Sequence, residues 1–438
     1  MADVGARGHM ASVDLLEAGR EMQDFITDLY PTCRSITGQG LRSTLRAIRD
    51  RVPLQIHEIP SGTQVLDWTV PQEWNITDAY IKDSAGLRIV DFQECNLHVV
   101  NYSEPVDLRL TLQELLPHLH SLADHPDWIP YRTSYYKRGW GFCLPDAQLQ
   151  QLGDGEYDVH IASSLEDGHL SYGELVVPGA SSDEVLFSTH ACHPSLCNDN
   201  LSGVALATQI AKCLSGATLR YSYRFLFIPG TIGSITWLAR NEDGVSRVKH
   251  GLVIACVGDP GAMTYKRSRR HAAEIDRAVT HVLAHRDAGH NLLDFSPYGY
   301  DERQYCSPGF NLPVGCLSRT PHGCFPEYHT SADDLAFVRP EWLADSLDVC
   351  LSVIDVLEGN RTYVNRSPKG EPQLGRRGLY PSMGGKEAEQ AQLAMLWALN
   401  LSDGTNTLLD IAERSRMDFS CLRDAATVLL EHGLLQEC

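Results

Sequence analysis

The sequence lacks any long run of uncharged apolar residues, which excludes a helix that could cross a membrane. Such a helix needs about 18 or more apolar residues in succession. The N-terminal residues also lack a basic region followed by an apolar stretch, the pattern of a secretion signal. We therefore expect a cytoplasmic protein.

The cysteines do not form the pattern of a disulfide framework. There are 13 of them, an odd number, scattered through a chain of 438 residues. Without a secretion signal, this usage indicates reduced thiols. Cys192 and Cys197 also have no second CxxC-like pair at suitable spacing, which argues against a structural zinc knot.

Positive charge is scarce. The chain has 37 Lys and Arg residues against 56 Asp and Glu residues, which gives a formal net charge of −19. A surface of this sign repels the phosphates of nucleic acids and anionic lipids. We therefore expect neither a nucleic-acid nor a membrane partner, but a small-molecule or short peptide-like substrate.

The pattern of apolar residues changes along the chain, and these changes indicate domains. Helical spacing is found over residues 14–51, short alternating strands follow over 54–157, and near-continuous apolar strands separated by helices begin at Gly173. The last pattern is typical of an α/β sheet with helices on its faces.

A tail of three helices, spaced as in a winged helix, ends the chain. The predicted units are a tag remnant at 1–12, an α/β catalytic domain at 13–52 and 158–366, an inserted β-rich domain at 53–157, a linker at 367–385 and a winged-helix-like domain at 386–438.

Histidines and carboxylates follow several of the predicted strands, where the chemistry of α/β folds gathers. The strand EVLFST is followed by HACHPSLCNDNLSG, the strand GLVIACVG by an aspartate, and PEYHTSADD stands later in the chain. Imidazole and carboxylate groups that arrive from several strand ends suit a zinc site with an open position. The candidate ligands are His190, His193, Asp199, Asp259 and His329.

The segments HACHPSLCNDNLSG, IPGTIGS, VGDPG and YHTSADD resemble the co-catalytic zinc aminopeptidases, a fold class that also contains glutaminyl cyclase and the transferrin-receptor ectodomain. The whole chain more closely resembles aminopeptidase-like proteins that are often linked to polysaccharide biosynthesis. That resemblance implies an α/β fold, a zinc-exopeptidase-like mixed sheet flanked by helices, with an inserted small β-rich domain and a C-terminal winged-helix-like domain. It also rests on LYPTCRSITGQG, SGTQVLDWTVPQEWNI, IPYRTSYYKRGWGFC, YKRSRR and GYDERQYCSPGFNLPVG.

The resemblance implies roles for the candidate ligands. Asp199 would take the bridging position, and His190 or His193 would bind the metal. His190 directly follows the strand, as the aminopeptidase ligand does. Cys192, however, replaces the usual aspartate two residues later, so His193 is the alternative.

A pair of glutamates that the aminopeptidases carry is absent. The first is their general base and the second binds a second metal. When this sequence is aligned with the aminopeptidases on the Gly-Ser that opens the next helix, Gly230 and Thr231 stand in the places of the two glutamates. Loss of the second carboxylate predicts one Zn²⁺ per chain. Loss of the base removes a group that is typically worth about 10²- to 10⁴-fold in rate.

Gly230 has two interpretations. It is either a backbone position that needs a positive φ, or a residue whose small size opens space beside the metal for a bulkier or anionic substrate. Glu302 and Glu327 lie close in sequence to site segments, so one of them is a candidate for proton transfer; the alternative is that both are surface glutamates.

Three groups of residues are candidates for substrate binding. The basic run YKRSRR would clamp a carboxylate or phosphate, tyrosines of the inserted domain would wall the pocket, and an acidic residue in GYDERQ matches a position near the aminopeptidase pocket. The candidates are Lys266, Arg267, Arg269, Tyr135, Tyr136 and Asp301. The alternatives are a solvated charged face for the basic run and a local aromatic core for the tyrosines.

We therefore expect a zinc-dependent, aminopeptidase-like hydrolase that acts on an amide or peptide-like bond of a small, anionic metabolite. A non-hydrolytic ligand-binding protein and an acyl-transfer enzyme on the same scaffold are the alternatives. The third helix of the tail offers Arg423 against several acids, which argues against DNA binding. The tail should instead pack on the catalytic domain or form a homo-oligomer contact.

Overall fold

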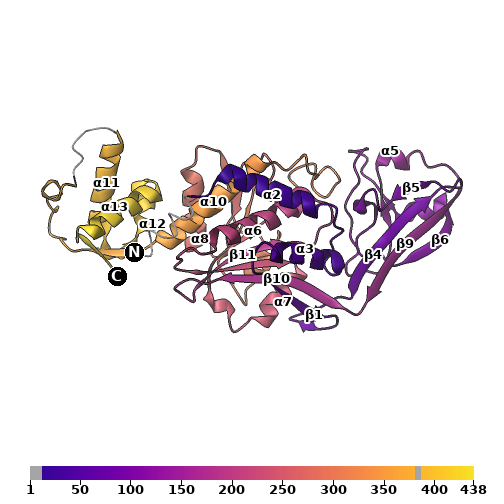
Figure 1. Ribbon diagram of the computed structural model, residues 1–438, viewed down its shortest axis with the longest axis horizontal. Coiled ribbons are helices and arrows are strands. Elements are labelled where there is room, and N and C mark those ends of the chain that lie inside the picture. Colours follow the sequence, from indigo (N-terminus) through magenta and orange to yellow (C-terminus); the bar gives the residue numbers. More distant parts are fainter. Residues whose placement is uncertain (1–11, 380–385) are drawn as a thin grey trace.

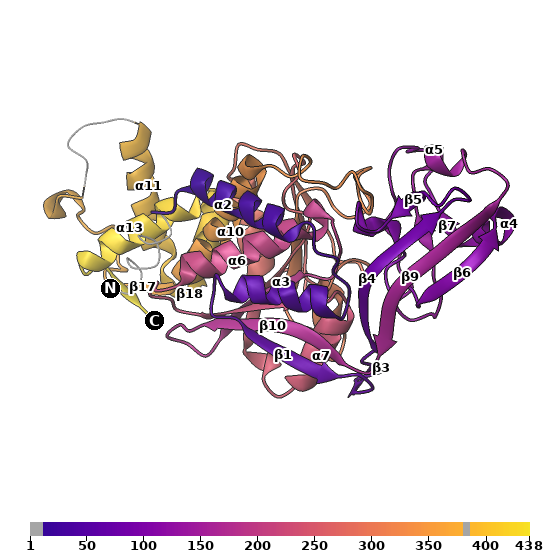
Figure 2. The ribbon, with the colours of Figure 1, turned by 45° about the vertical axis from the view of Figure 1, so that its right-hand side comes forward.

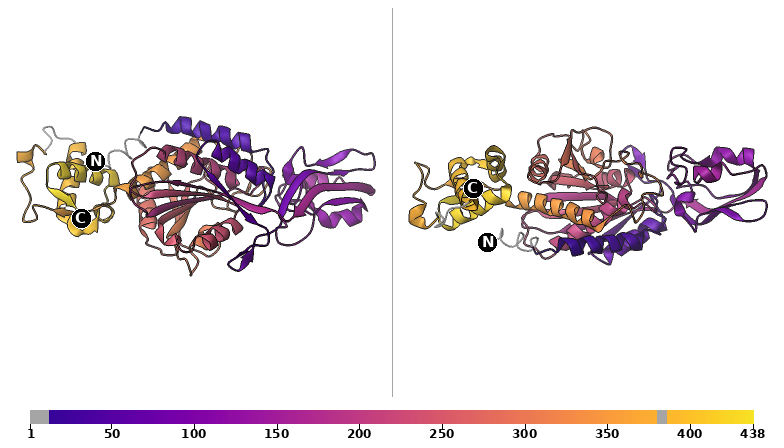
Figure 3. Two further views of the ribbon diagram at one scale, coloured as in Figure 1. Left: turned by 60° about the horizontal axis from the view of Figure 1, so that its bottom comes forward. Right: turned by 90° about the horizontal axis from the view of Figure 1, so that it is seen from above.

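The computed structural model describes residues 12–379 and 386–438 (Figure 1). An α/β body lies in the middle, with the C-terminal unit at one end and a β-rich unit at the other (Figures 1 and 3). Residues 1–11 of the expected tag remnant and residues 380–385 of the expected linker lie outside the described residues. Within the described ranges, no helix is both long and apolar enough to span a membrane.

A mixed sheet of eight strands forms the centre of the body, in the order β1-β10-β12-β11-β13-β16-β14-β15. The four strands β12, β11, β13 and β16 run parallel, whereas β1–β10, β10–β12 and β14–β16 pair antiparallel. The strands are β1 Gln55–Pro60, β10 His169–Val177, β11 Glu184–His190, β12 Ser222–Ile228, β13 Val248–Ile254, β14 Met263–Lys266, β15 His290–Leu293 and β16 Val314–Ser318.

Helices cover both faces of this sheet (Figure 3), as the fold-class prediction requires, and the prediction is confirmed. Every residue of β11 is buried, which explains why its apolar residues Val185, Leu186 and Phe187 are consecutive instead of alternating with exposed polar ones. The helices are α2 Leu15–Leu29, α3 Gln39–Arg49, α6 Ser202–Leu214, α7 Ile232–Arg240, α8 Glu274–Ala284, α9 Glu302–Tyr305 and α10 Pro340–Gly359. Short 3-10 turns lie at Asn96–His98, Leu116–His118, Val245–Arg247 and Gly375–Arg377.

The β-rich unit is built on a second sheet, with four strands in the order β5-β4-β9-β6. Its core packs around buried residues such as Ile81 of β4 and Val159 of β9. The elements are β4 Glu73–Lys82, β5 Arg88–Asp91, β6 Val106–Thr111 and β9 Glu156–Glu166, with the small pairs β2 Gln64–Val65 and β3 Trp68–Thr69, β7 Leu119–His120 and β8 Phe142–Cys143, and the short helices α4 Leu112–Leu115 and α5 Asp146–Leu149.

One boundary of the predicted inserted domain is wrong by a strand. β1 was placed in that domain, but it pairs along its whole length with β10 and forms the edge of the main sheet (Figure 2). An edge strand with a partly exposed face alternates in sequence like a strand of a small β domain. β9 also runs across the predicted boundary between residues 157 and 158.

The C-terminal unit combines three helices with a three-stranded sheet in the order β18-β17-β19. β17 lies before residue 366, where the catalytic domain was predicted to end, so this boundary is also corrected. The elements are β17 Thr362–Asn365, β18 Asp403–Thr407, β19 Leu435–Glu437, α11 Lys386–Leu401, α12 Leu408–Ser415 and α13 Phe419–Glu431.

The C-terminal unit packs on the α/β body through ion pairs. Arg423 of α13 is 4% exposed and pairs with Asp355 of α10. Arg277 of α8 pairs with Asp410 and Glu413, each at 2.6 Å. The expected packing of the tail on the catalytic domain is therefore present in the structure.

Candidate metal centre

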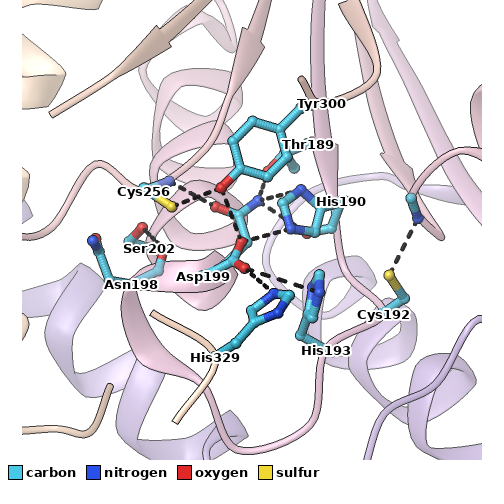
Figure 4. Close-up of polar contacts among 12 residues, drawn as sticks. Thr189, His190, Cys192, His193, Asn198, Asp199, Ser202, Cys256, Tyr300 and His329 are labelled. Carbon is cyan, nitrogen blue, oxygen red and sulfur yellow. Dashed lines mark hydrogen bonds and ion pairs between the residues drawn. The ribbon is translucent and has the colours of Figure 1, made fainter. Parts of the chain in front are cut away.

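Three histidines surround one buried carboxylate at the carboxyl ends of the parallel strands (Figure 4). His190 is the last residue of β11, and Asp199 lies in the irregular turn Cys197–Leu201 that leads into α6. His329 comes from the long loop between β16 and α10. The Asp199 side chain is fully enclosed, and His190 is only 2% exposed.

The imidazole nitrogens approach both oxygens of Asp199. Nε2 of His190 lies 2.9 Å from Oδ1, and Nε2 of His329 lies 2.9 Å from Oδ2. Nε2 of His193 is 3.9 Å from Oδ2. The structure thus brings together four of the five predicted ligands, including both alternatives for the early histidine.

The electrostatics of the cluster favour an ionised Asp199 beside a neutral His193. Burial by itself would raise the pKa of Asp199, but the attraction of His193 and the hydrogen bonds of His190 and His329 outweigh it and hold that pKa well below its usual range. Burial lowers the pKa of His193 to about 3. Nδ1 of His193 is also buried and has no hydrogen-bond partner among the described residues.

Two residues outside the predicted site hold the cluster in place. Arg34, from the segment LYPTCRSITGQG, is 1% exposed and donates to the carbonyl oxygens of His193 (2.7 Å), Pro194 (2.6 Å) and Leu29 (2.7 Å). Asp333 accepts the backbone N–H of Asp199 at 2.8 Å.

Asp259 does not join the cluster, and we remove it from the ligand set. Its Oδ1 accepts from the Thr320 hydroxyl (2.5 Å) and the Gly261 N–H (2.7 Å), and its Oδ2 accepts from the Asn198 side-chain amide (3.0 Å). The prediction failed because β13 ends at Ile254, so the chain has already passed the sheet edge when it reaches Asp259.

Position 230 faces the cluster. A Cβ atom on Gly230 would lie 3.6 Å from Cys192 Sγ and 3.7 Å from His190 Cβ, which are ordinary contacts. Gly230 is not among the glycines with positive φ; the positive value, 65°, belongs to Thr231. The backbone interpretation of Gly230 is therefore wrong, and the geometry fits the interpretation in which a small residue leaves space.

Backbone strain gathers around the cluster. Thr231, Cys256 and His329 have φ values of 65°, 53° and 57°, a region that non-glycine residues seldom adopt. Such conformations cost about 1–3 kcal/mol each and persist where the surrounding structure imposes them. Their concentration beside three histidines supports a functional site.

The predicted proton-transfer role of Glu302 is not supported. Its side chain is buried, and its Oε1 accepts from Lys266 Nζ at 2.7 Å. Burial raises the pKa of Glu302. An enclosed and paired carboxylate cannot reach a substrate. Glu327 is half-buried, and its backbone carbonyl accepts from the Thr330 hydroxyl at 2.8 Å.

The basic run YKRSRR does not converge on the histidines. Lys266 pairs with the buried glutamate, Arg267 with Asp294 at 3.0 Å, and Arg269 donates to Asn311 Oδ1 at 3.0 Å. The predicted clamp is therefore corrected to a set of local contacts, because β14 lies next to the edge of the sheet, beside β15.

Asp301 fixes the turn that carries positions 230 and 231. Its Oδ1 accepts from the Thr231 N–H (2.7 Å) and the Ser234 hydroxyl (2.6 Å). Two residues later, Arg303 donates from Nη2 to Thr231 Oγ1 at 3.2 Å. Sequence reasoning missed Arg303, although the segment GYDERQ that contains it had been singled out.

Aromatic rings enclose the histidines. Tyr300 stacks on His190 with ring centroids 5.0 Å apart and donates to Asp199 Oδ1 at 3.4 Å. Tyr131, from the β-rich unit, presents its ring to His193 (5.2 Å) and His329 (5.0 Å). Tyr131 begins the aromatic stretch that was predicted to wall the pocket, whereas Tyr300 was not predicted as a site residue.

The β-rich unit is tied to the cluster through its backbone. The Tyr131 N–H donates to the carbonyl oxygen of His329 at 2.7 Å, and the Ser331 N–H donates to that of Ile129 at 2.9 Å. Tyr131 also shares a hydrogen bond of 2.6 Å with the predicted pocket residue Tyr135. Tyr136 lies farther out and is 57% exposed.

Residues 23–360 match the model of a domain of unknown function, DUF4910, and residues 361–437 match a winged helix-turn-helix model. The first match spans most of the chain. The chain belongs to the DUF4910 family. A Clostridium acetobutylicum protein, described as a candidate polysaccharide biosynthesis protein with an aminopeptidase-like domain, is 53% identical over 421 residues, which are 96% of this chain and 97% of the relative.

Solved structures place this DUF4910 protein in the aminopeptidase-like fold. A crystal structure of a candidate peptidase from C. acetobutylicum has a TM-score of 0.93 at 52% identity and covers 97% of this chain and 98% of its own. A zinc aminopeptidase from Bacillus subtilis has a TM-score of 0.55 at 11% identity and covers 77% of this chain and 94% of its own. A peptidase M28 precursor from Shewanella amazonensis has a TM-score of 0.56 at 14% identity and covers 82% of this chain and 97% of its own. The last two show the fold alone.

Proposed function

We propose that this DUF4910 protein is a metal-dependent hydrolase that binds one Zn²⁺ per chain at the histidine cluster and cleaves an amide or peptide-like bond in a small, anionic metabolite. The observation that carries the proposal is the convergence of three imidazoles on the buried Asp199. The aminopeptidase-like fold supports it, because zinc aminopeptidases share that fold.

The donor set fits zinc. Zinc–nitrogen bonds of about 2.0–2.1 Å place two ligand atoms of a tetrahedral site roughly 3.3 Å apart. The nitrogen–oxygen distances in the cluster, 2.9 Å for two pairs and 3.9 Å for the third, bracket that value. Zinc also requires neutral imidazoles, and the lowered pKa of His193 keeps that ring neutral.

We assign Asp199, His190 and His193 as the ligands, because one ligand atom from each of them lies within 4.8 Å of the other two. Three protein ligands would leave a position open for water or substrate. His329, whose Nε2 lies 2.9 Å from the second oxygen of Asp199, would stand beside that position and would hydrogen-bond to the water or the substrate carbonyl.

When bound in such a site, zinc would polarise a carbonyl and would lower the pKa of bound water to about 7. The protein contributes position and enclosure: Asp199 is fixed by backbone contacts with Asp333, and the rings of Tyr131 and Tyr300 restrict the access of bulk water. Position 230 offers no base, so we expect turnover about 10²- to 10⁴-fold below that of an enzyme with a positioned base.

The first test is the metal content per chain of tag-free protein, measured by elemental analysis before and after chelation. We expect about one zinc per chain, lost in His190→Ala and His193→Ala and retained in His329→Ala. His432→Ala, which changes an exposed histidine of the C-terminal unit, is the matched control and should keep its zinc.

The outcomes separate the alternatives. Zinc lost in His329→Ala but retained in His193→Ala would exchange the roles of these two histidines. About two zinc ions per chain would refute the mononuclear site. A protein that takes up no zinc after reloading would refute the hydrolase proposal and favour a ligand-binding protein on this scaffold.

A further inference from the structure

By the resemblance to the aminopeptidases, Thr231 stands in the place of the glutamate that binds their second metal. The Thr231 hydroxyl accepts a hydrogen bond from Nη2 of Arg303 at 3.2 Å. A Cβ atom on Gly230, next to it, would lie 3.6 Å from Cys192 Sγ and 3.7 Å from His190 Cβ, so the glycine leaves room there. A guanidinium and this room therefore lie together at the turn after β12.

Arg303 has unused hydrogen-bonding capacity. Its Nε is buried and has no hydrogen-bond partner, and within residues 12–379 and 386–438 no ion pair joins it to an acidic side chain. Buried donors almost always have an acceptor, so an unpartnered one indicates a ligand or an ordered water. A guanidinium offers five donors, and its usual anionic partners are carboxylates and phosphates.

The acids nearest to Arg303 in sequence are already engaged. Asp301 accepts from the Thr231 backbone and the Ser234 hydroxyl through Oδ1, and Glu302 accepts from Lys266. Among the described residues, Arg303 forms no ion pair with either of these neighbours.

Arg303 lies close to the candidate metal centre. It donates to Thr231, and a Cβ atom on the neighbouring Gly230 would lie 3.7 Å from His190 Cβ. Tyr300, three residues before Arg303, stacks on His190 and donates to Asp199 Oδ1 at 3.4 Å. The guanidinium and the candidate metal centre therefore border the same region.

We propose that Arg303 binds a carboxylate or phosphate group of the substrate, in the space beside Gly230 and Thr231, and so selects anionic substrates. This inference rests on the proposed function, in which the same substrate reaches the metal centre. It assigns the anion site to Arg303 of α9 and not to the basic run YKRSRR.

The test is direct anion binding by isothermal titration calorimetry, with inorganic phosphate and with succinate as separate probes. Zinc-loaded and zinc-free protein are both titrated, because either anion could bind zinc itself. The variants are Arg303→Met, Arg303→Lys and the control Arg267→Met, an arginine of the neighbouring basic run that already pairs with Asp294.

We expect the zinc-free wild type to bind one of the two probes, and Arg303→Met to weaken that binding about tenfold or more, as for a lost charged hydrogen bond. Arg303→Lys should weaken the binding less, because lysine keeps the positive charge but lacks the paired N–H donors of the guanidinium. Arg267→Met should bind like the wild type. Tighter binding of phosphate would indicate a phosphorylated substrate, and tighter binding of succinate a carboxylated one; either supports the proposal.

Binding that is equal in wild type and Arg303→Met overturns the proposal, as does the absence of binding of either probe. If binding vanishes on zinc removal in every variant, the anion binds the metal and the assignment to Arg303 is wrong, while the metal centre stands. Loss of binding in Arg303→Met from a protein that holds no zinc supports the anion site although the proposed hydrolase fails.

Discussion

The backbone N–H of Gly230 donates a hydrogen bond to Sγ of Cys192 at 3.2 Å. By the resemblance given in the sequence analysis, both residues are expected to stand where the zinc aminopeptidases carry acids: Cys192 in place of an aspartate, and Gly230 in place of the general-base glutamate. The two residues touch each other, and they lie on one side of the cluster. On that expectation, the two positions together would exchange two negative charges for a thiol and an open space.

Gly230→Glu should fold and change the preference of the site. The first side-chain atom has room at 3.6–3.7 Å from its neighbours, so we expect the Tm to change little. The new carboxylate should raise hydrolysis of neutral aminoacyl amides, by up to about 10²-fold. It should also weaken phosphate binding at Arg303 by repulsion.

The isosteric variant Gly230→Gln is the control for this experiment, because it fills the same volume without charge. Steady-state assays with leucine p-nitroanilide and titrations with phosphate measure the two effects. Equal behaviour of the Glu and Gln variants would show that charge at position 230 is irrelevant.

Arg34→Met should destabilise the protein and loosen the metal centre. The substitution leaves three buried carbonyl oxygens without their donor, including that of His193, and each such loss costs about 1–3 kcal/mol. Urea unfolding should show a loss of about 3 kcal/mol or more. Arg46→Met, at an exposed position of α3, should stay within about 0.5 kcal/mol of the wild type. Similar losses in the two variants would contradict the role of Arg34.

Acid should weaken the contact between α8 and the C-terminal unit. Nε2 of His281 accepts the Phe419 N–H at 3.1 Å, and burial lowers the pKa of His281 to about 4. An unfolded histidine titrates near about 6.5, so the unfolded chain binds the additional proton first. Stability from this contact is complete above pH of about 6.5 and is lost progressively as the pH falls towards about 4.

Melting curves of wild type and His281→Gln between pH 7 and 4.5 check this expectation. Glutamine can accept the same N–H but does not titrate, so the Tm of the wild type should fall further with decreasing pH than the Tm of the variant. An equal fall in both proteins would mean that protonation of His281 does not affect stability in this range.

The winged-helix-like unit should not bind DNA through α13. The arginine that a DNA-reading helix would present, Arg423, is buried and paired with Asp355 of α10. Removing one partner of a buried pair costs about 3–5 kcal/mol, so Arg423→Met should unfold at a clearly lower urea concentration. Titration of the wild type with duplex DNA at several salt concentrations should show no salt-sensitive binding, and such binding would refute the expectation.

The sequence predicts those helices and strands whose own residues show a clear pattern of apolar side chains, without information from distant segments. β11 was predictable because every residue of EVLFSTH is buried and its core is apolar. β1 was assigned to the wrong domain, because an edge strand has the alternation of any half-exposed strand and its partner lies more than 100 residues away.

The same reason explains which site residues could be predicted from the sequence and which could not. His190 and Asp199 were found because they follow a strong strand in a dense cluster of polar residues. Arg303 was missed because its significance depends on Thr231, 72 residues earlier, which a different strand brings to it. Asp259 was overestimated because the sequence does not reveal how far the chain runs past the sheet edge before the aspartate.

The main-chain contact between Tyr131 and His329 joins the β-rich unit to the candidate metal centre. Any tilt of the β-rich unit against the α/β body would pull on the loop that carries His329, which lies beside the proposed zinc ligands. A shortened protein without that unit should therefore bind zinc less tightly, even with every proposed ligand present. If zinc binds as proposed, motion between the two domains would change the occupancy of the site, and a substrate that draws the domains together would also strengthen zinc binding.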